Sequence, residues 1–394
     1  MVCSPMNHSS EDASSSDEVD LETEVGADTI LKTEAYFLNL LFLVSLVATK
    51  DSSPIFIWMN RFICVNAFVI GVGALIYISI TSFVTREHTR SAVSVTGRVL
   101  FCLYSSTMYI YISGLARCSP GLVTLLRDVG RREPNNSTHS SPCNKKYPIK
   151  AIVLLVLFLC VLNVLVTVFT PGLIESLFGL THHPVFLGYL FFMSYILSLG
   201  WLISIPFVYL GCKVLTNKIQ YLTSYIQTEF HENGNDPIDL FFVMAWHDEL
   251  YEKNRLLTQG ISGLVTLTIG FLAIASTTIA IHIAIIGISV NDTFWFLSNF
   301  FVLVATCYPV AELEIQNKFL HIELGALPMP DNMPNLNLYL NLYQTCAIKA
   351  SRSEFGIFVK GTKFRITFNA LIRIGSITLS VIIFFGGALR VAGR

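Results

Sequence analysis

The sequence contains few charged residues. Asp, Glu, Lys and Arg make up 13% of its 394 residues, whereas about a quarter is usual for soluble globular proteins. Hydrophobic residues make up 53%, and the formal net charge is −1. A chain with this composition and without an overall basic character is neither a typical soluble enzyme nor a typical nucleic-acid-binding protein.

The sequence also lacks the motifs of the common enzyme classes. It has no GxxxxGK[ST] or GxGxxG nucleotide loop, no HExxH or CxxC metal or redox motif, and no GxSxG nucleophile elbow. His182 and His183 are adjacent, but no acidic residue or third His lies near them to complete a metal site. We therefore predict no enzyme activity, no cofactor and no metal.

The N-terminal region shows no secretory signal peptide, because no basic segment precedes an apolar stretch and a small-residue cleavage site there. Instead, nine of the 27 acidic residues fall between Glu11 and Glu34. A segment this acidic and serine-rich is typical of a disordered tail. We predict a tail over residues 1–34 and a membrane domain over residues 35–394.

Long apolar runs dominate the rest of the chain. A bilayer core about 30 Å thick requires about 20 residues of helix, and seven stretches reach or approach this length: residues 55–84, 95–115, 149–171, 185–212, 261–288, 294–310 and 366–389. A shorter run at residues 36–47 predicts a re-entrant helix, or else a first span with frayed ends. The expected fold is an all-α polytopic membrane protein with seven transmembrane helices.

The basic residues predict the orientation. Residues 117–150, 213–255 and 318–365 together carry 17 Lys and Arg, against four in the loops and tail of the opposite side. Basic loops stay in the cytoplasm, so we predict an N-terminus inside and a C-terminus outside. The sequons are divided: Asn291 is a candidate glycosylation site in a predicted outer loop, whereas Asn135 and Asn136 fall in an inner one.

Helical periodicity continues past several spans on the predicted inner side. Apolar residues recur at helical spacing within 213–258 and 311–364. These segments predict cytoplasmic helix extensions that pack together, the last of them directly before the final span.

Ionisable and aromatic residues inside the spans are the candidates for function. An Arg in hydrocarbon is costly, so Arg373, two turns into the last span, either pairs within the bundle or lines an aqueous path. Ligand-pocket candidates in the expected outer half of the bundle are Tyr104, Tyr109, Tyr189, Tyr195 and His282. Packing is the alternative role for the tyrosines.

The last span carries a short motif. Residues 375–385 keep a Thr at position 378 and a Phe at position 385, with Leu379 and Phe384 between them. This stretch resembles the last helix of the insect gustatory and odorant receptor superfamily, in which Thr-Tyr is followed by apolar residues and Gln-Phe. Residues 355–358 and Asn254 also resemble segments of that family.

The resemblance implies a chemosensory receptor of the plasma membrane, gustatory-receptor-like and active in taste. It implies a ligand-gated cation channel that assembles as a homo- or heterotetramer, binds a small molecule and has its last helix around the pore. Candidate positions on that helix are Arg373, Thr378, Val381, Ile382 and Phe385. An Arg facing the lumen would disfavour cations. The alternatives are a G-protein-coupled receptor of opposite topology and a transporter or non-conducting membrane protein.

Overall fold

The computed structural model describes residues 46–84, 89–119, 149–169, 184–232, 240–286, 290–326, 336–352, 356–362 and 364–377, together with 380 and 384. This part of the chain is helical, with a single isolated bridge between Phe358 and Arg365. The helices are α2 (Pro54–Val84), α3 (Thr89–Cys118), α5 (Ile149–Phe169), α7 (Pro184–Leu202), α8 (Ser204–Glu232), α9 (Leu240–Ile286), α10 (Val290–Gly325) and α11 (Leu336–Arg352). A final helix, Phe368–Ile377, follows them. The all-α prediction is confirmed.

Five helical segments are long and apolar enough to cross a membrane. They are Pro54–Gly73, Val99–Cys118, Phe191–Thr228, Leu240–Thr278 and Phe296–Gly325. Two shorter apolar helices, Val153–Leu162 and Phe368–Ile377, coincide with the third and last predicted spans. The chain is therefore a multi-pass membrane protein. The predicted tail 1–34 and all but the last two residues of the predicted re-entrant segment 36–47 lie outside the described residues.

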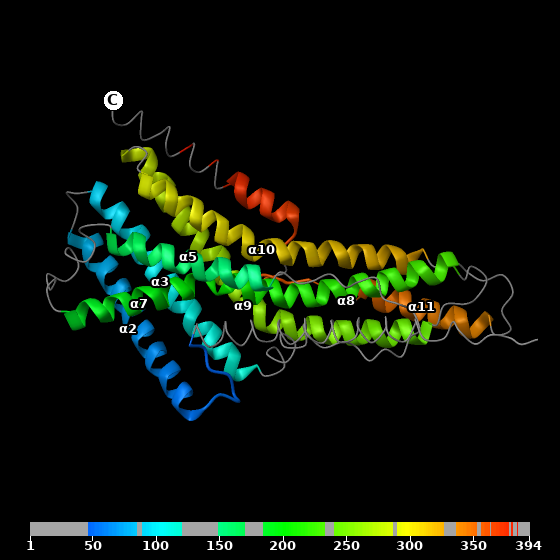
Figure 1. The fold of residues 1–394 in the computed structure, drawn as a ribbon. Coiled ribbons are helices and arrows are strands. Elements are labelled where there is room, and N and C mark those ends of the chain that lie inside the picture. The colour runs from blue at the N-terminus through cyan, green and yellow to red at the C-terminus, as the bar shows by residue number, and fades with distance from the viewer. Residues whose placement is uncertain are drawn as a thin grey trace, which may run out of the picture.

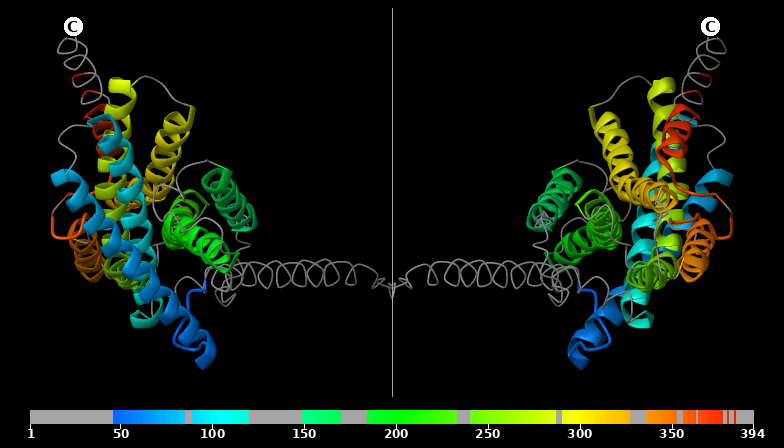
Figure 2. Two further views of the ribbon diagram at one scale, coloured as in Figure 1. Left: turned by 90° about the vertical axis from the view of Figure 1, so that its left-hand side faces the viewer. Right: turned by 90° about the vertical axis from the view of Figure 1, so that its right-hand side faces the viewer.

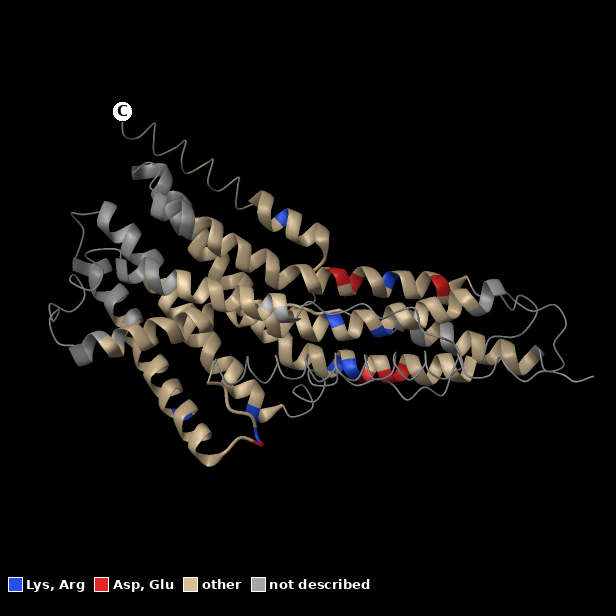
Figure 3. Ribbon diagram, in the orientation of Figure 1, with Lys and Arg blue, Asp and Glu red and all other residues tan. Residues whose placement is uncertain are grey.

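The molecule is elongated and has two distinct ends. Figure 1 shows α2, α3, α5 and α7 splayed at one end, while α8, α9, α10 and α11 run on together at the other. We call this narrow part the rod and define it as residues 213–232, 240–260, 311–326 and 336–352. Most of the charged residues gather along it, as Figure 3 shows. In the described part of the splayed end charged residues are fewer and include Arg61 and Arg117.

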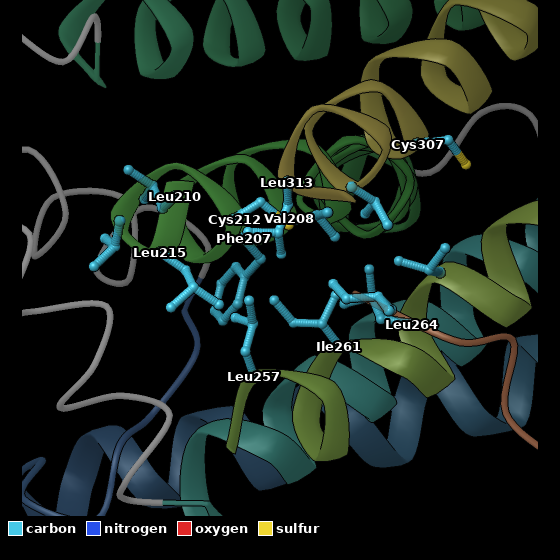
Figure 4. Packing of buried hydrophobic residues seen from close by; sticks show 14 of the residues in the cluster. Phe207, Val208, Leu210, Cys212, Leu215, Leu257, Ile261, Leu264, Cys307 and Leu313 are labelled. Carbon is cyan, nitrogen blue, oxygen red and sulfur yellow. The ribbon is translucent and has the colours of Figure 1, made fainter. Parts of the chain in front are cut away.

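Three long helices connect the two ends. With 47 residues, α9 is about 70 Å long. Figure 4 shows, in a close view of one stretch of these helices, how α8, α9 and α10 pack through buried side chains that include Phe207, Leu215, Ile261, Leu264 and Leu313. In the rod, Lys213 Nζ of α8 donates to Glu312 Oε1 of α10 at 2.9 Å. The same helices thus bury an apolar seam and carry an ion pair between them.

A proline explains the interruption between α7 and α8. The predicted span 185–212 is helical on both sides of Ile203, which forms a turn. Pro206 has no N–H to donate to the carbonyl of Leu202, so the regular hydrogen-bond ladder is broken there. The Ile203 N–H still donates to Leu199 O at 2.8 Å, and the chain continues with little change of direction. In α10, Pro309 is accommodated inside the helix.

A short hairpin leads into the last helix. The Val359 N–H donates to Phe364 O at 2.9 Å, and the Arg365 guanidinium lies over the Phe358 ring at 5.0 Å. Gly361 turns the hairpin with a φ of 81°, a conformation that costs glycine little. Figure 2 shows the last helix and α11 on the side of the molecule opposite α5.

Candidate ligand-binding and pore elements

A polar layer crosses the apolar helices near the middle of α3. Tyr104 is buried, and its Oη lies 3.2 Å from Thr268 Oγ1 of α9. Its ring contacts that of Phe271 with centroids 5.9 Å apart. Ser204 Oγ of α8 lies 3.5 Å from Thr306 Oγ1 of α10. The Tyr104 hydroxyl also interacts with that of Ser204, which links the two pairs. We call Tyr104, Thr268, Ser204 and Thr306 the Tyr104 layer; it joins four helices through hydroxyl groups.

Several buried polar atoms of the same helices have no hydrogen-bond partner among the described residues. They are the hydroxyls of Ser105 and Ser106 in α3, the hydroxyl of Ser276 in α9 and the amide oxygen of Asn299 in α10. An unsatisfied buried group costs about 1–3 kcal/mol. A small molecule with a hydroxyl or carbonyl group could satisfy such atoms, so they add hydrogen-bonding capacity to the bundle interior.

Tyr109 belongs to a separate cluster near the start of α2. Its Oη donates to the carbonyl of Leu46 at 3.2 Å, and Asn60 Nδ2 donates to the same carbonyl at 2.7 Å. Asn60 Nδ2 also donates to Ser113 Oγ at 3.2 Å, and Asn60 Oδ1 accepts from Arg117. Tyr109 is therefore part of a network that fastens the segment before α2 to α3. It does not contact the Tyr104 layer through these bonds.

The other expected pocket residues are dispersed. Tyr189 is exposed, and its Oη donates to Asn66 Oδ1 of α2 at 3.0 Å. Tyr195 is half-buried against the core. His282 and Asn291 lie in α9 and α10, but their side chains are outside the described part. Of the five predicted pocket residues, Tyr104 alone is placed in the polar layer.

Sequence reasoning missed most of the polar layer. Thr268, Ser204 and Thr306 are small hydroxyl residues within apolar runs, and Asn299 is a lone amide in another. The candidates that the sequence suggests inside the spans are ionisable and aromatic groups. The usable signal was the isolated polar residue in an apolar helix, because such a group needs a partner in hydrocarbon.

The last helix begins at an N-cap. The Ala370 N–H donates to Thr367 Oγ1 at 3.1 Å, which satisfies one of the free donors of the first turn. Ala370 is buried and Leu371 and Ile374 pack on the core, whereas Arg373 is exposed. The other candidate pore positions, Thr378, Val381, Ile382 and Phe385, lie outside the described residues.

Two segments singled out in the sequence lie together in the fold. The Gly356 N–H donates to Asn254 Oδ1 at 3.4 Å, and Thr258 Oγ1 donates to Gly356 O at 3.3 Å. The Lys360 N–H donates to Thr266 Oγ1 at 2.8 Å. These hydrogen bonds hold the hairpin before the last helix against residues 254–266 of α9. The last of these, Thr266, lies two residues before Thr268 of the Tyr104 layer.

The described segments offer no cluster for a metal. Within them, no group of three or more His, Cys, Asp or Glu side chains is placed to hold an ion. The chemistry that the arrangement provides is hydrogen bonding inside an apolar bundle.

Comparisons with known proteins identify the fold. No family model and no curated protein matches the sequence. The structure of the insect olfactory receptor OR5 from Machilis hrabei in complex with eugenol matches with a TM-score of 0.65 and 13% identity, covering 92% of this chain and 98% of the receptor chain. A second structure of that receptor matches with a TM-score of 0.57 and 13% identity, over 93% and 98% of the two chains. The chain has the fold of an insect olfactory receptor, and this is not an enzyme fold.

Proposed function

We propose that this protein is a subunit of a chemosensory, ligand-gated ion channel of the plasma membrane. The observation that carries the proposal is the fold likeness to an insect olfactory receptor over nearly the whole of both chains. The five candidate spans and the two shorter apolar helices support a seven-helix membrane domain. A chemosensory role follows from this likeness, which is to an olfactory receptor and does not favour taste over odour.

The Tyr104 layer supports a ligand site within the helix bundle. Tyr104 and Thr268 supply hydroxyls in an otherwise apolar interior, and Asn299 adds an amide oxygen without a partner among the described residues. Binding sites of this kind take a ligand with an apolar body and one or two polar groups. The related receptor was solved with eugenol. For this chain we propose a small, uncharged, largely apolar molecule that carries a hydroxyl or carbonyl group.

Exposed apolar side chains support assembly into a tetramer. In the rod, where charged residues are frequent, Phe241, Phe319, Ile322 and Leu338 are each exposed. Exposed apolar groups on a polar element are typical of a surface that contacts another chain. The last helix packs on the core along one side only. In a ring of four copies its other side would face a central pore.

The channel proposal can be tested by expression in oocytes. The full chain is injected, its delivery to the surface is measured by biotinylation, and currents are recorded under voltage clamp during application of eugenol and a panel of small alcohols, phenols and ketones. We expect ligand-evoked current. The Tyr104→Phe variant keeps the ring and removes the hydroxyl, and it should shift the concentration for half-maximal current. Surface-delivered protein without current for any ligand would contradict the proposal.

The proposed orientation needs its own test. We propose an N-terminus in the cytoplasm and glycosylation of Asn291 on the outside. A tag placed at residue 2 should be reached by antibody only after the cells are permeabilised. Replacing Asn291 by Gln should abolish a shift in mass on glycosidase treatment. A tag accessible on intact cells would instead favour a receptor that couples to G proteins.

A further inference from the structure

One face of the last helix is polar. Asn369, Arg373, Ser376 and Ser380 are all exposed. At 100° per residue these four positions fall within an arc of about 60° around the helix axis. The hydroxyls of Ser376 and Ser380 donate back to the carbonyls of Ile372 and Ser376 at 2.9 and 2.8 Å. A narrow polar stripe therefore runs along a helix that is otherwise apolar.

The opposite face of this helix is already occupied. Leu371 and Ile374 pack against the core, and the Phe368 ring contacts that of Tyr308 in α10 with centroids 5.4 Å apart. Contact with its own subunit therefore fixes the rotation of the helix about its axis. The stripe points away from the subunit, and Arg373 is the charged residue within it.

Arg373 has no anionic partner in the described part of the subunit. The Asp and Glu residues whose side chains are described belong to the rod, apart from Asp51 near the start of α2, and no ion pair joins any of them to Arg373. Arg373 lies five residues beyond Phe368, which is about 7.5 Å along the helix. A charged group here is costly in hydrocarbon unless its long side chain reaches the polar interface, and water is the more favourable surrounding.

These observations favour a water-filled pore over lipid as the surroundings of the stripe. Lipid would surround the Arg373 guanidinium and the Asn369 amide with hydrocarbon, whereas a water-filled pore would hydrate both. Four copies of an Arg around one axis form a ring of positive charge. Rings of Arg or Lys are the arrangement that pores for anions use, and they repel cations.

We infer that Arg373 sets the ion selectivity of this channel, so that its pore passes anions in preference to cations. The inference rests on the proposed channel function and replaces the cation selectivity expected from the sequence resemblance. The stripe of Asn369, Arg373, Ser376 and Ser380 lines the pore. The Arg373 guanidinium and the Asn369 amide N–H groups can donate to a hydrated anion, whereas the serine hydroxyls already donate to backbone carbonyls.

The test measures the reversal potential of the current evoked by eugenol or another active member of the panel, under a tenfold NaCl gradient. For the wild-type chain we expect a reversal close to the chloride equilibrium potential. Arg373→Gln should move it toward zero, and Arg373→Glu should move it toward the sodium equilibrium potential. Arg61→Gln, which removes an exposed Arg of α2, should leave it unchanged.

Chemical modification separates loss of charge from misfolding. Arg373→Cys should behave like Arg373→Gln, and 2-aminoethyl methanethiosulfonate, which adds back a positive charge, should restore the chloride preference. A wild-type reversal at the sodium equilibrium potential that does not change in Arg373→Gln would overturn the inference and leave the channel proposal standing. Surface-delivered protein that carries no current with any ligand would overturn both.

Discussion

The side-chain oxygen of Asn254 accepts a hydrogen bond from the backbone N–H of Gly356, although the two residues lie 102 positions apart. Both groups are buried. Gly356 has a φ of 134°, which a residue with a Cβ rarely adopts. The contact holds the start of the hairpin on α9, and the hairpin leads directly into the last helix. The position of the proposed pore helix thus depends on this bond.

Replacing Asn254 by Ala should loosen the hairpin. The Gly356 N–H would remain buried without an acceptor, at a cost of about 1–3 kcal/mol. We expect a lower melting temperature in detergent and a changed concentration for half-maximal current, because the last helix loses an anchor. Asn254→Asp keeps an acceptor oxygen at the same place and should restore the Gly356 bond. If the Ala and Asp variants behave alike, the hydrogen bond does not hold the hairpin.

Adding a methyl group at Gly200 should destabilise the bundle. A Cβ at this position in α7 would lie 2.4 Å from the backbone oxygen of Ser105 in α3. One of the two helices would have to move to relieve this clash. Overpacking of this kind typically costs about 1–3 kcal/mol. We expect Gly200→Ala to lower the melting temperature and the amount of protein at the surface.

Gly188 provides the control in the same helix. A Cβ at Gly188 would meet nothing within 4 Å, and Ala favours a helix over Gly. The melting temperature of Gly188→Ala should equal or exceed that of the wild type. Equal stability of the Gly188 and Gly200 variants would show that α3 and α7 are not in close contact.

The bond between Tyr104 and Thr268 should be weak in energy. Thr268 Oγ1 also donates to Leu264 O at 2.9 Å, so Tyr104→Phe does not leave it without a partner. Side-chain hydrogen bonds between membrane helices contribute about 0.6 kcal/mol on average. A double-mutant cycle with Tyr104→Phe and Thr268→Val should return a coupling of about this size in the unliganded protein. A coupling near zero would mean that the two hydroxyls do not interact.

Removing the hydrogen-bond network around Asn60 should lower stability more than removing the bond between Tyr104 and Thr268. Asn60→Leu leaves Arg117 and Ser113 without an interaction that each makes with this amide, and we expect a loss of about 1–3 kcal/mol in thermal denaturation. Asn66→Leu is the matched control in the same helix. Asn66 bonds to its own helix at Phe62 O and to the exposed Tyr189. Its removal should change stability by less than about 0.5 kcal/mol.

The helices could be predicted from the sequence because their signal is local. Each apolar run had to form a helix, since every backbone group in hydrocarbon must bond within the segment. The extension of α9 to 47 residues, past the predicted span 261–288, also followed from local periodicity. The break at Ile203 was harder to predict from the sequence. Pro206 lies close to it, but whether a proline ends a helix depends on packing, since Pro309 leaves α10 continuous.

The site was harder to predict, because it depends on which helix faces touch. Tyr104 and Tyr109 are five residues apart in α3, and rotation along the helix sends one to α9 and the other toward α2. One sequence alone does not show which face of a helix meets which neighbouring helix. Arg373 was equally hard to orient from the sequence. Its position within a span was evident, but the side of the helix on which it lies follows only from the packing of Leu371 and Ile374 on the core.

The length of α9 has a mechanical consequence. A helix of about 70 Å that moves as one unit acts as a lever. If it tilts by 5° about one end, its other end moves sideways by about 6 Å. The hairpin contacts at Asn254 and Thr266 lie on either side of Gly263, the middle residue of this lever. Such a tilt would displace the start of the last helix by roughly half that distance.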